Sequence, residues 1–289
     1  MFSRDELKQY QMAQKFTDKC MRFFLGDVRE KDRLHRAFHG VDIIVHAAAL
    51  KQVPAAEYNP FEAVKTNVFG AQNIIDTAIN NNVEKVIALS SDKAVNPVNL
   101  YGATKLCADK LFTVANSYVG IDQCTILSVV RYGNVLGSRG SVIPFFRERA
   151  KTGKIPITDK RMTRFWITLD QAVHFVLKCL ERMKGGEIFV PKIPSMKVID
   201  LARVIAPSCE FEYIGIRPGE KLHEVLIPED DNRHVLEYND YYIISPSITY
   251  TGNDVVSGGK RVPENFRYSS DSNTWWLTDE EAKALLESV

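Results

Sequence analysis

The sequence predicts an α/β protein with a doubly wound parallel sheet and a smaller, interleaved α/β lobe. Nearly unbroken apolar runs occupy residues 41–49, 85–91 and 124–134, as in strands that are buried on both faces of a parallel sheet. Helical apolar patterns occupy about 61–80 and 103–117. Because strands alternate with helices of this length, we expect βαβ units that build a Rossmann-like sheet.

The start of the chain predicts the end of a strand and the start of the following helix. Ser3 is the expected N-cap, and Glu6 would close a capping box. A dinucleotide-binding unit opens with a strand, a Gly-rich turn and a helix, and the sequence contains no GxGxxG. We therefore expect that the first strand and its Gly-rich loop, about 30 residues of the βαβ unit, are absent.

After Asn134 the alternation gives way to shorter elements punctuated by Gly and Pro. The pattern predicts an amphipathic helix over 169–183 and short strands over 187–190 and 241–245. The polar stretch 251–271 predicts a long loop. A final helix begins at Thr278, with Glu281 placed for a capping box.

Two interleaved domains follow from this organisation. We expect the dinucleotide-binding domain to comprise residues 1–137 and about 166–190. The substrate lobe would comprise about 138–165 and 191–289.

Composition excludes several classes of protein. Hydrophobic residues make up 45% and charged residues 25%, which is ordinary for a globular chain. Lys and Arg number 37 against 36 Asp and Glu, so no basic footprint for nucleic acid is expected. No apolar run approaches the roughly 20 residues of a bilayer span, and the charged N-terminus is unlike a secretory signal. Five scattered cysteines without CxxC predict reduced thiols, a cytoplasmic location and no metal site.

The strongest chemical signal is the segment SSDKAVNPVNLYGATK, residues 90–105. Tyr101 and Lys105 share one face of a predicted helix, and Asp92 and Lys93 follow a predicted strand at the sheet edge where ligands bind. A free tyrosine has a pKa near about 10, which Lys105 and an oxidised nicotinamide would lower. By themselves, the same residues also fit an exposed helix face and an ordinary ion pair.

This segment resembles the extended short-chain dehydrogenase/reductases, and within them the inverting UDP-N-acetylglucosamine 4,6-dehydratases of pseudaminic acid synthesis. The Asp92-Lys93 pair is the specific mark, since most of the wider group carries Thr-Asp-Glu or Ser-Ser-Ala there. Membrane-anchored dehydratases that retain the C5 configuration also carry Asp-Lys but have methionine in place of Tyr101. HAAALKQVPAAEYNP, RYGNVLGSRGSVIPFF, ITDKRMTRFWITLD, GGEIFVPKIPSMK and GIRPGEKLHEVLIP also look like that family's blocks.

The resemblance implies a role for each of four catalytic residues. Tyr101 would take the O4 proton while C4 is oxidised by NADP⁺, and Lys105 would hold the phenolate and the ribose. Lys93 would remove the C5 proton as a neutral amine, which requires a pKa depressed by burial and nearby positive charge. Asp92 would protonate the departing C6 hydroxyl. Return of a proton from the opposite face would invert C5.

The resemblance also implies cofactor contacts. Arg4 stands where an acidic residue would mark NAD, and a basic residue there accommodates the 2′-phosphate of NADP. Asp27 resembles the family's adenine contact. Small residues at the end of the strand over 41–49 would let the backbone approach the cofactor. The cofactor-binding candidates are Arg4, Asp27, Ala47, Ala48, Lys51, Asn67, Tyr101 and Lys105.

Substrate contacts are expected from the second part of the chain. A UDP-sugar carries a diphosphate, and arginine forms bidentate contacts with phosphate. The residues that fall in family-like substrate blocks are Asn134, Arg139, Thr158, Arg161, Arg164, Arg217, Lys221 and Glu224.

The expected small-molecule partner is UDP-N-acetylglucosamine, and the expected product is a UDP-4-keto-6-deoxy-L-hexosamine for pseudaminic acid, flagellin glycosylation or a related surface glycan. We expect a homo-oligomer, which the resemblance implies is a hexamer. Two alternatives stay open. A nucleotide-sugar 4-epimerase would need no C5 base, so Lys93 argues against it. A truncated, inactive fragment would explain the expected absence of the Gly-rich turn.

Overall fold

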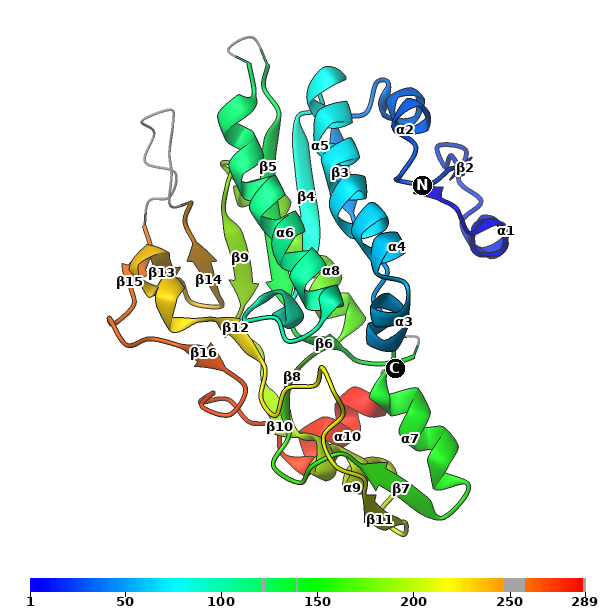
Figure 1. Cartoon of the computed structure of the whole chain (residues 1–289), viewed down its shortest axis with the longest axis vertical. Coiled ribbons are helices and arrows are strands. Elements are labelled where there is room, and N and C mark those ends of the chain that lie inside the picture. The colour runs from blue at the N-terminus through cyan, green and yellow to red at the C-terminus, as the bar shows by residue number, and fades with distance from the viewer. Residues whose placement is uncertain (121–122, 139, 247–257, 288–289) are drawn as a thin grey trace.

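The computed structural model describes residues 1–120, 123–138, 140–246 and 258–287. Its centre is a seven-stranded sheet in the order β15-β13-β14-β9-β5-β4-β3 (Figure 1). The four strands from β9 to β3 run parallel, and the other three add to that sheet in antiparallel orientation. The strands of this sheet are β3 (Ile43–His46), β4 (Lys85–Ser91), β5 (Ile126–Tyr132), β9 (Ile188–Pro191), β13 (Val235–Glu237), β14 (Tyr241–Ile244) and β15 (Lys260–Arg261).

The predicted parallel strands form, and their apolar runs explain why. β4 and β5 pair without interruption from Lys85 opposite Ile126 to Ser91 opposite Tyr132. Most of their side chains are buried, as expected for strands covered on both faces. The prediction for β4 is confirmed to the residue. The runs over 41–49 and 124–134 form strands only in their central parts.

One face of the sheet is covered by the helices that follow β3 and β4 (Figure 1). Their apolar side chains meet Ile44 of β3 in one cluster that includes Ile74 and Phe112. The predicted helix over 61–80 is divided by a π-helical turn, and the helix predicted from 103 begins earlier because Asn99 caps it. The elements that follow β3 and β4 are α3 (Val53–Tyr58), α4 (Pro60–Val64), η1 (Lys65–Phe69), α5 (Gly70–Asn80), η2 (Asp92–Ala94), α6 (Leu100–Val114) and η3 (Ala115–Tyr118). The helix α2 (Lys31–Phe38) precedes β3 and contacts α5.

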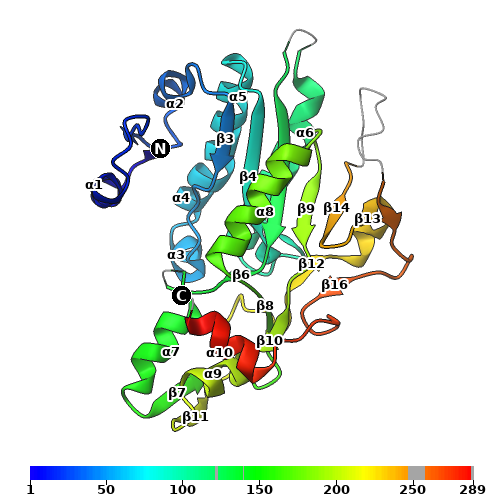
Figure 2. The same ribbon diagram turned by 180° about the vertical axis from the view of Figure 1, so that it is seen from behind.

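The opposite face carries one helix among the described residues, α8 (Leu169–Arg182) (Figure 2). It begins with a capping box between Thr168 and Gln171. Its buried side packs against Ile87, Val130 and Phe189. Its other side is an exposed apolar stripe with one residue per turn: Leu169, Val173 and Leu177.

The N-terminal elements form a separate unit beside α2 (Figures 1 and 2). The strands β1 (Phe2–Ser3) and β2 (Phe24–Leu25) pair in parallel, and α1 (Glu6–Lys15) connects them. The predicted strand-to-helix transition is confirmed, but the predicted N-cap is wrong. Asp5 caps α1 by accepting the Lys8 N–H at 2.9 Å, whereas Ser3 accepts the N–H of Asp5.

β3 is the last strand of the large sheet, and the described residues place no strand between it and β1. Ile44 and His46 face α5 and α6 and are buried. Ile43 and Val45 face the other side and keep 49% and 47% of their surface exposed. An apolar surface at β3 is therefore open to solvent on the face that carries α8 (Figure 2).

A smaller lobe lies beyond the carboxyl ends of the parallel strands (Figure 1). Its three small sheets pair as β10-β8-β6, β11-β7 and β12-β16, and its apolar centre includes Phe146, Ile155 and Trp166. The predicted capping box of Thr278 and Glu281 is confirmed. The lobe contains β6 (Asn134–Val135), α7 (Val142–Ala150), β7 (Lys154–Ile157), β8 (Thr163–Ile167), β10 (Ser195–Lys197), α9 (Val198–Ile205), β11 (Glu210–Tyr213), β12 (Val225–Ile227), η4 (Glu229–His234), β16 (Tyr268–Ser269) and α10 (Asp279–Glu287).

The hydrogen bonds of the sheets cross the expected domain boundaries. β13, β14 and β15 belong to the large sheet, although 191–289 was expected to be lobe. The buried apolar strand β14 completes the sheet beside β9, which explains its place. β6, expected within the first domain, pairs with β8 of the lobe. In the polar stretch 251–271, residues 251–257 lie outside the described residues, and β15 and β16 lie in the remainder.

Within the ranges given above, no helix has both the length and the apolar character that a membrane crossing requires.

The open surface at β3 generates a stability prediction. Replacing Ile43 and Val45 by Thr should change the free energy of unfolding by no more than about 0.5 kcal/mol each, because both side chains are half exposed. Binding of a hydrophobic dye should fall. As a control, Ile44→Thr at the buried neighbouring position should cost about 2 kcal/mol or more. Urea denaturation measures both, and a loss at Ile43 or Val45 as large as at Ile44 would show that the surface is covered.

Candidate active site

The candidate site begins where β4 ends, at the edge that faces the lobe. Ser91 closes the strand and donates a hydrogen bond to Asp92 Oδ1 at 2.7 Å. The Ser91 hydroxyl also accepts the Lys93 N–H at 3.3 Å, which starts the short helix η2. The two residues that the sequence marks are thereby fixed at the carboxyl end of a central parallel strand, where ligands bind in such sheets.

Gly102 lets the first turn of α6 lie directly on η2. A Cβ at this position would lie 2.3 Å from the carbonyl oxygen of Lys93 and 3.0 Å from Pro97 Cβ. Asn99 caps the helix by accepting the Gly102 N–H at 2.8 Å. The close approach brings Tyr101, the residue before Gly102, to the end of β4.

Tyr101 and Lys105 lie one helical turn apart, and both are buried. The Lys105 ammonium donates to the carbonyl oxygen of Leu89 at 2.7 Å. Burial raises the pKa of the Tyr101 phenol, and the lowering by Lys93 is too weak to reverse this. Burial lowers the pKa of the Lys105 ammonium, which Asp109 opposes. The phenolate expected from the sequence is therefore not favoured by the protein alone.

Asp92 and Lys93 form a close ion pair, with Lys93 Nζ 2.9 Å from Asp92 Oδ1. Desolvation lowers the pKa of the Lys93 ammonium, but the carboxylates of Asp92 and Glu224 outweigh it and the pKa is raised. This result is opposite to the depressed pKa expected for a base. The pKa of Asp92 is lowered, because Lys93 and Ser91 outweigh the effect of its complete burial.

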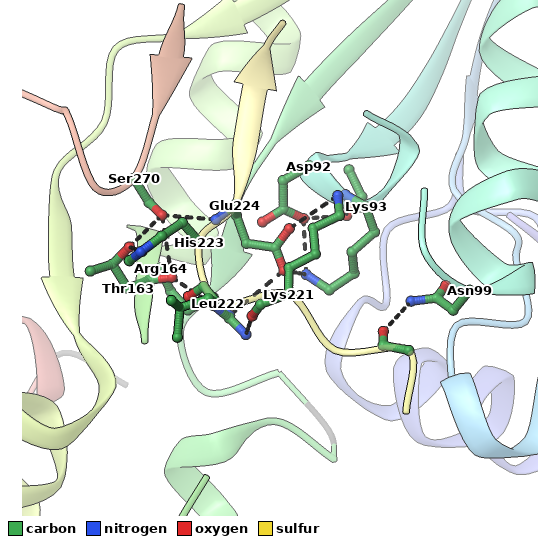
Figure 3. A network of polar contacts seen from close by, with 12 residues as sticks. Asp92, Lys93, Asn99, Thr163, Arg164, Lys221, Leu222, His223, Glu224 and Ser270 are labelled. Atoms are coloured by element: carbon green, nitrogen blue, oxygen red, sulfur yellow. Dashed lines mark hydrogen bonds and ion pairs between the residues drawn. The ribbon is translucent and has the colours of Figure 1, made fainter. Parts of the chain in front are cut away.

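The lobe places further charged residues beside the Asp92–Lys93 pair, among them Glu224 on the segment that precedes β12 (Figure 3). Glu224 Oε1 lies 3.8 Å from Lys93 Nζ and 3.7 Å from Arg164 Nε. Its Oε2 lies 3.6 Å from Lys221 Nζ. We call Asp92, Lys93, Arg164, Lys221 and Glu224 the charge cluster.

Backbone carbonyl groups hold the lobe's cations in place. The Arg164 guanidinium donates to the carbonyl oxygens of Thr163, Lys221 and Leu222 at 2.7 to 3.1 Å. Lys221 Nζ donates to the carbonyl oxygen of Val95 at 2.5 Å, which links the lobe to η2. The cluster therefore connects β4, β8 and the segment before β12.

Two cofactor candidates at the N-terminal strands meet. Arg4 Nη1 lies 3.5 Å from Asp27 Oδ2, and the Arg4 side chain stays 54% exposed. Asp27 also pairs with Arg29 at 2.8 Å. Desolvation raises the pKa of Asp27, but its hydrogen bonds and ion pairs with Arg29, helped by Arg4, outweigh it and the pKa is lowered. Arg4 is thus exposed and available to a ligand beside a carboxylate.

The cofactor-binding candidates that follow β3 differ in burial. Ala47, Ala48 and Lys51 are exposed beyond the carboxyl end of the strand. Asn67 is buried instead and uses its whole amide group. It accepts the Leu50 N–H at 2.8 Å and donates to the carbonyl oxygen of Leu50 and to Thr104. In this structure Asn67 joins the loop after β3 to α6.

Of the five other substrate candidates, the four that the structure describes lie outside the charge cluster. Arg161 pairs with Asp159 at 2.8 Å, and Arg217 lies 3.8 Å from Glu220; both arginines are more than half exposed. Thr158 is half-buried after β7. Asn134 lies on β6, and within the described chain its Oδ1 is buried without a hydrogen-bond partner. Arg139 lies outside the described residues.

Asp109 and Asn99 are two further residues of the site that were not predicted from the sequence. Asp109 is buried and accepts hydrogen bonds from Ser90 at 2.8 Å and Arg131 at 3.2 Å, which ties α6 to β4 and β5. Its place one turn after Lys105 was a usable signal. Asn99 donates to the carbonyl oxygen of Gly219 at 2.8 Å, so the cap of α6 also holds the loop that carries Arg217 (Figure 3). Its N-cap identity was the available signal.

A parallel sheet with helices on its faces, a Tyr-x-x-x-Lys pair at a strand end and a lobe over that edge define an extended short-chain dehydrogenase/reductase. Within that class, the chain belongs to the family described as polysaccharide biosynthesis protein, whose sequence model matches residues 1–246.

Similar proteins cover nearly the whole chain. A Campylobacter jejuni relative named UDP-N-acetylglucosamine 4,6-dehydratase (inverting) is 55% identical over 100% of this chain and 88% of its own. A Rickettsia canadensis relative named UDP-glucose 4-epimerase is 42% identical over 99% of this chain and 85% of its own. The X-ray structure of Pen from Bacillus thuringiensis has a TM-score of 0.89 at 39% identity, covering 100% of this chain and 89% of Pen.

The packing at Gly102 predicts the sign of a substitution. Alanine is about 1 kcal/mol more favourable than glycine inside a helix, so Gly102→Ala would stabilise the protein if space were available. Because the added Cβ meets the Lys93 carbonyl oxygen, we expect a destabilisation of about 1 to 3 kcal/mol instead. Urea denaturation measures the difference. A more stable variant would contradict the close approach of α6 to η2.

Proposed function

We propose that this protein catalyses the inverting 4,6-dehydration of UDP-N-acetylglucosamine with NADP as cofactor. The observation that carries the proposal is the Asp92–Lys93 ion pair, 2.9 Å long, at the end of β4 beside Tyr101. The reaction needs an acid and a base within reach of adjacent sugar carbons, and this pair supplies both groups. The relatives from Campylobacter jejuni that bear the dehydratase name support it.

The residues would divide the reaction as follows. Tyr101 removes the O4 proton, and Lys105 stabilises the phenolate that results. The keto group at C4 acidifies the C5–H, and Lys93 takes that proton. Asp92 protonates the C6 hydroxyl, which leaves as water. Return of a proton to C5 from the opposite face gives the inverted configuration.

Residues that follow β3 and β1 are suited to a nicotinamide dinucleotide. Exposed Ala47 and Ala48 leave room for a close backbone approach, and the exposed Arg4 supplies a charge for a 2′-phosphate. When bound, the nicotinamide would accept a hydride from C4 and return it at C6. The protein's part is to orient that ring against the sugar and to hold the protons at Tyr101, Lys93 and Asp92.

A nucleotide-sugar 4-epimerase is the second candidate, because relatives at 42% identity carry that name. An epimerase returns the hydride to C4 and leaves the C6 hydroxyl in place. An epimerase does not use an acid–base pair at C5 and C6, whereas this chain holds such a pair, with Asp92 fully buried against Lys93. Mass spectrometry of the product separates the two functions, since only dehydration loses water.

The expected surroundings of the enzyme are part of the proposal. We place it in the cytoplasm, in the synthesis of pseudaminic acid or a related surface glycan such as one on flagellin. We also expect a homo-oligomer, with a hexamer as the form that the resemblance implies. Exposed aromatic side chains on α3, α4 and η1, at Tyr58, Phe61 and Phe69, are compatible with an interface between copies.

Lys93 can be tested by substitution. Lys93→Met should abolish dehydration and leave binding of the UDP-sugar within a few-fold, because the base is lost while the nucleotide contacts stay. Solvent deuterium should enter C5 only in the protein that has Lys93. The mass of the product measures dehydration, and the NMR signal of C5–H measures the entry of deuterium.

The matched control is Lys110→Met, the same change at an exposed position of α6, which should keep full activity. Full dehydratase activity in Lys93→Met would remove Lys93 from the mechanism.

Arg4 tests the choice of cofactor. One charge-assisted hydrogen bond contributes about 1.5 to 3 kcal/mol. Arg4→Ala should therefore weaken NADP binding by about ten- to a hundredfold and leave NAD binding nearly unchanged. Arg36→Ala, in the last turn of α2, is the control that should change neither. Calorimetric titration with both cofactors decides the matter, and an equal loss for NAD and NADP would refute a contact to the 2′-phosphate.

A further inference from the structure

Glu224 has an unusual position for a residue expected to contact substrate. Its side chain is only 4% exposed, and three cations surround its carboxylate at 3.6 to 3.8 Å. Its backbone N–H donates to Ser270 Oγ at 2.9 Å, and its carbonyl oxygen accepts the Ser270 N–H at 2.8 Å. The side chain is therefore held in place from the lobe and directed at the end of β4 (Figure 3).

We propose that Glu224 is a positioning residue that holds the Lys93 ammonium at the end of β4 and sets how readily Lys93 gives up its proton. The inference rests on the proposed function, in which Lys93 acts as the C5 base. It assigns Glu224 a role through Lys93 in place of the substrate contact expected from the sequence.

The charged groups around Lys93 come from three sides. Asp92 adjoins it on η2, Tyr101 faces it from α6, and Glu224, Arg164 and Lys221 come from the lobe. The cluster thus balances two carboxylates against three cations. Arg164 and Lys221 share the Glu224 carboxylate with Lys93, so they weaken its hold on the Lys93 ammonium.

The state needed for catalysis is one proton transfer away. A proton that moves from Lys93 Nζ to Asp92 Oδ1, over 2.9 Å, leaves a neutral amine and a carboxylic acid with no change in net charge. Asp92 Oδ2 is buried without a hydrogen-bond partner in the described structure, so no donor there opposes protonation of Asp92. The negative charge of Glu224 opposes the transfer by stabilising the ammonium.

Removal of that charge should therefore lower the pKa of Lys93, so that the ammonium gives up its proton more readily. An opposite charge within about 4 to 6 Å shifts a pKa by about 1 to 3 units, so Glu224→Gln should raise the neutral fraction of Lys93 at least about tenfold. Trace acetylation followed by mass spectrometry of the Lys93 peptide, between about pH 7 and 10, measures that fraction without any need for turnover. The cause is charge, so Glu224→Asp should restore most of the wild-type reactivity.

Two further variants serve as a control and as an independent test of the role of Glu224. Glu220→Gln, a partly exposed carboxylate four residues earlier that faces Arg217, should leave acetylation of Lys93 unchanged. Lys221→Met removes a cation that competes with Lys93 for the Glu224 carboxylate. Acetylation of Lys93 should therefore fall, opposite to the rise expected for Glu224→Gln. If Glu224→Gln does not fold, Lys221→Met decides alone. Unchanged reactivity in a folded Glu224→Gln, or a rise in Lys221→Met, overturns the proposal.

Activity supplies the second measurement. The rising limb of kcat/KM with pH should move to lower pH by at least about one unit in Glu224→Gln, whereas a purely structural defect lowers activity at all pH values. If wild-type protein forms no dehydrated product while Lys93 acetylation responds as expected, the proposed function fails and the role of Glu224 stands. The reverse outcome, turnover with unresponsive Lys93, overturns the role of Glu224 alone.

Discussion

The site depends on a close contact between the first turn of α6 and the backbone that follows β4. Only a glycine fits at position 102, because a Cβ there would meet the Lys93 carbonyl oxygen at 2.3 Å. That contact places Tyr101 at the strand end, close to Ser91, Asp92 and Lys93. Asp109 strengthens the same junction from inside, through Ser90 and Arg131. The geometry of the candidate site and the packing of the core thus depend on the same set of contacts.

Charge balance is the second constraint. Complete burial of the Asp92 carboxylate is costly unless cations neutralise its charge. Lys93 cannot do this alone, because it also pairs with a second carboxylate, Glu224. Arg164 and Lys221 complete the balance from the lobe, each held by backbone carbonyl groups. The lobe therefore does more than cover the sheet edge, because it carries part of the charge that makes the strand end stable.

The raised pKa of Lys93 changes how the proposed chemistry is understood. A lysine that begins as an ammonium beside a carboxylate needs a proton acceptor before it can act as a base. In the proposed mechanism Asp92, 2.9 Å away, is that acceptor, and it is also the group assigned to protonate the leaving hydroxyl. The same proton transfer therefore prepares both residues, which gives a physical reason for a strand that ends in Asp-Lys.

The sequence by itself determined the parallel strands, the helix that carries Tyr101 and Lys105, and the Asp92-Lys93 pair, because each depends on local periodicity or on neighbouring residues. The tertiary structure alone decided the rest. Glu224 meets Lys93 although nearly half of the chain separates them, β14 enters the large sheet, and Val45 is exposed while Ile44 is buried. These depend on which surfaces meet and which charges must be balanced, and no local pattern encodes either.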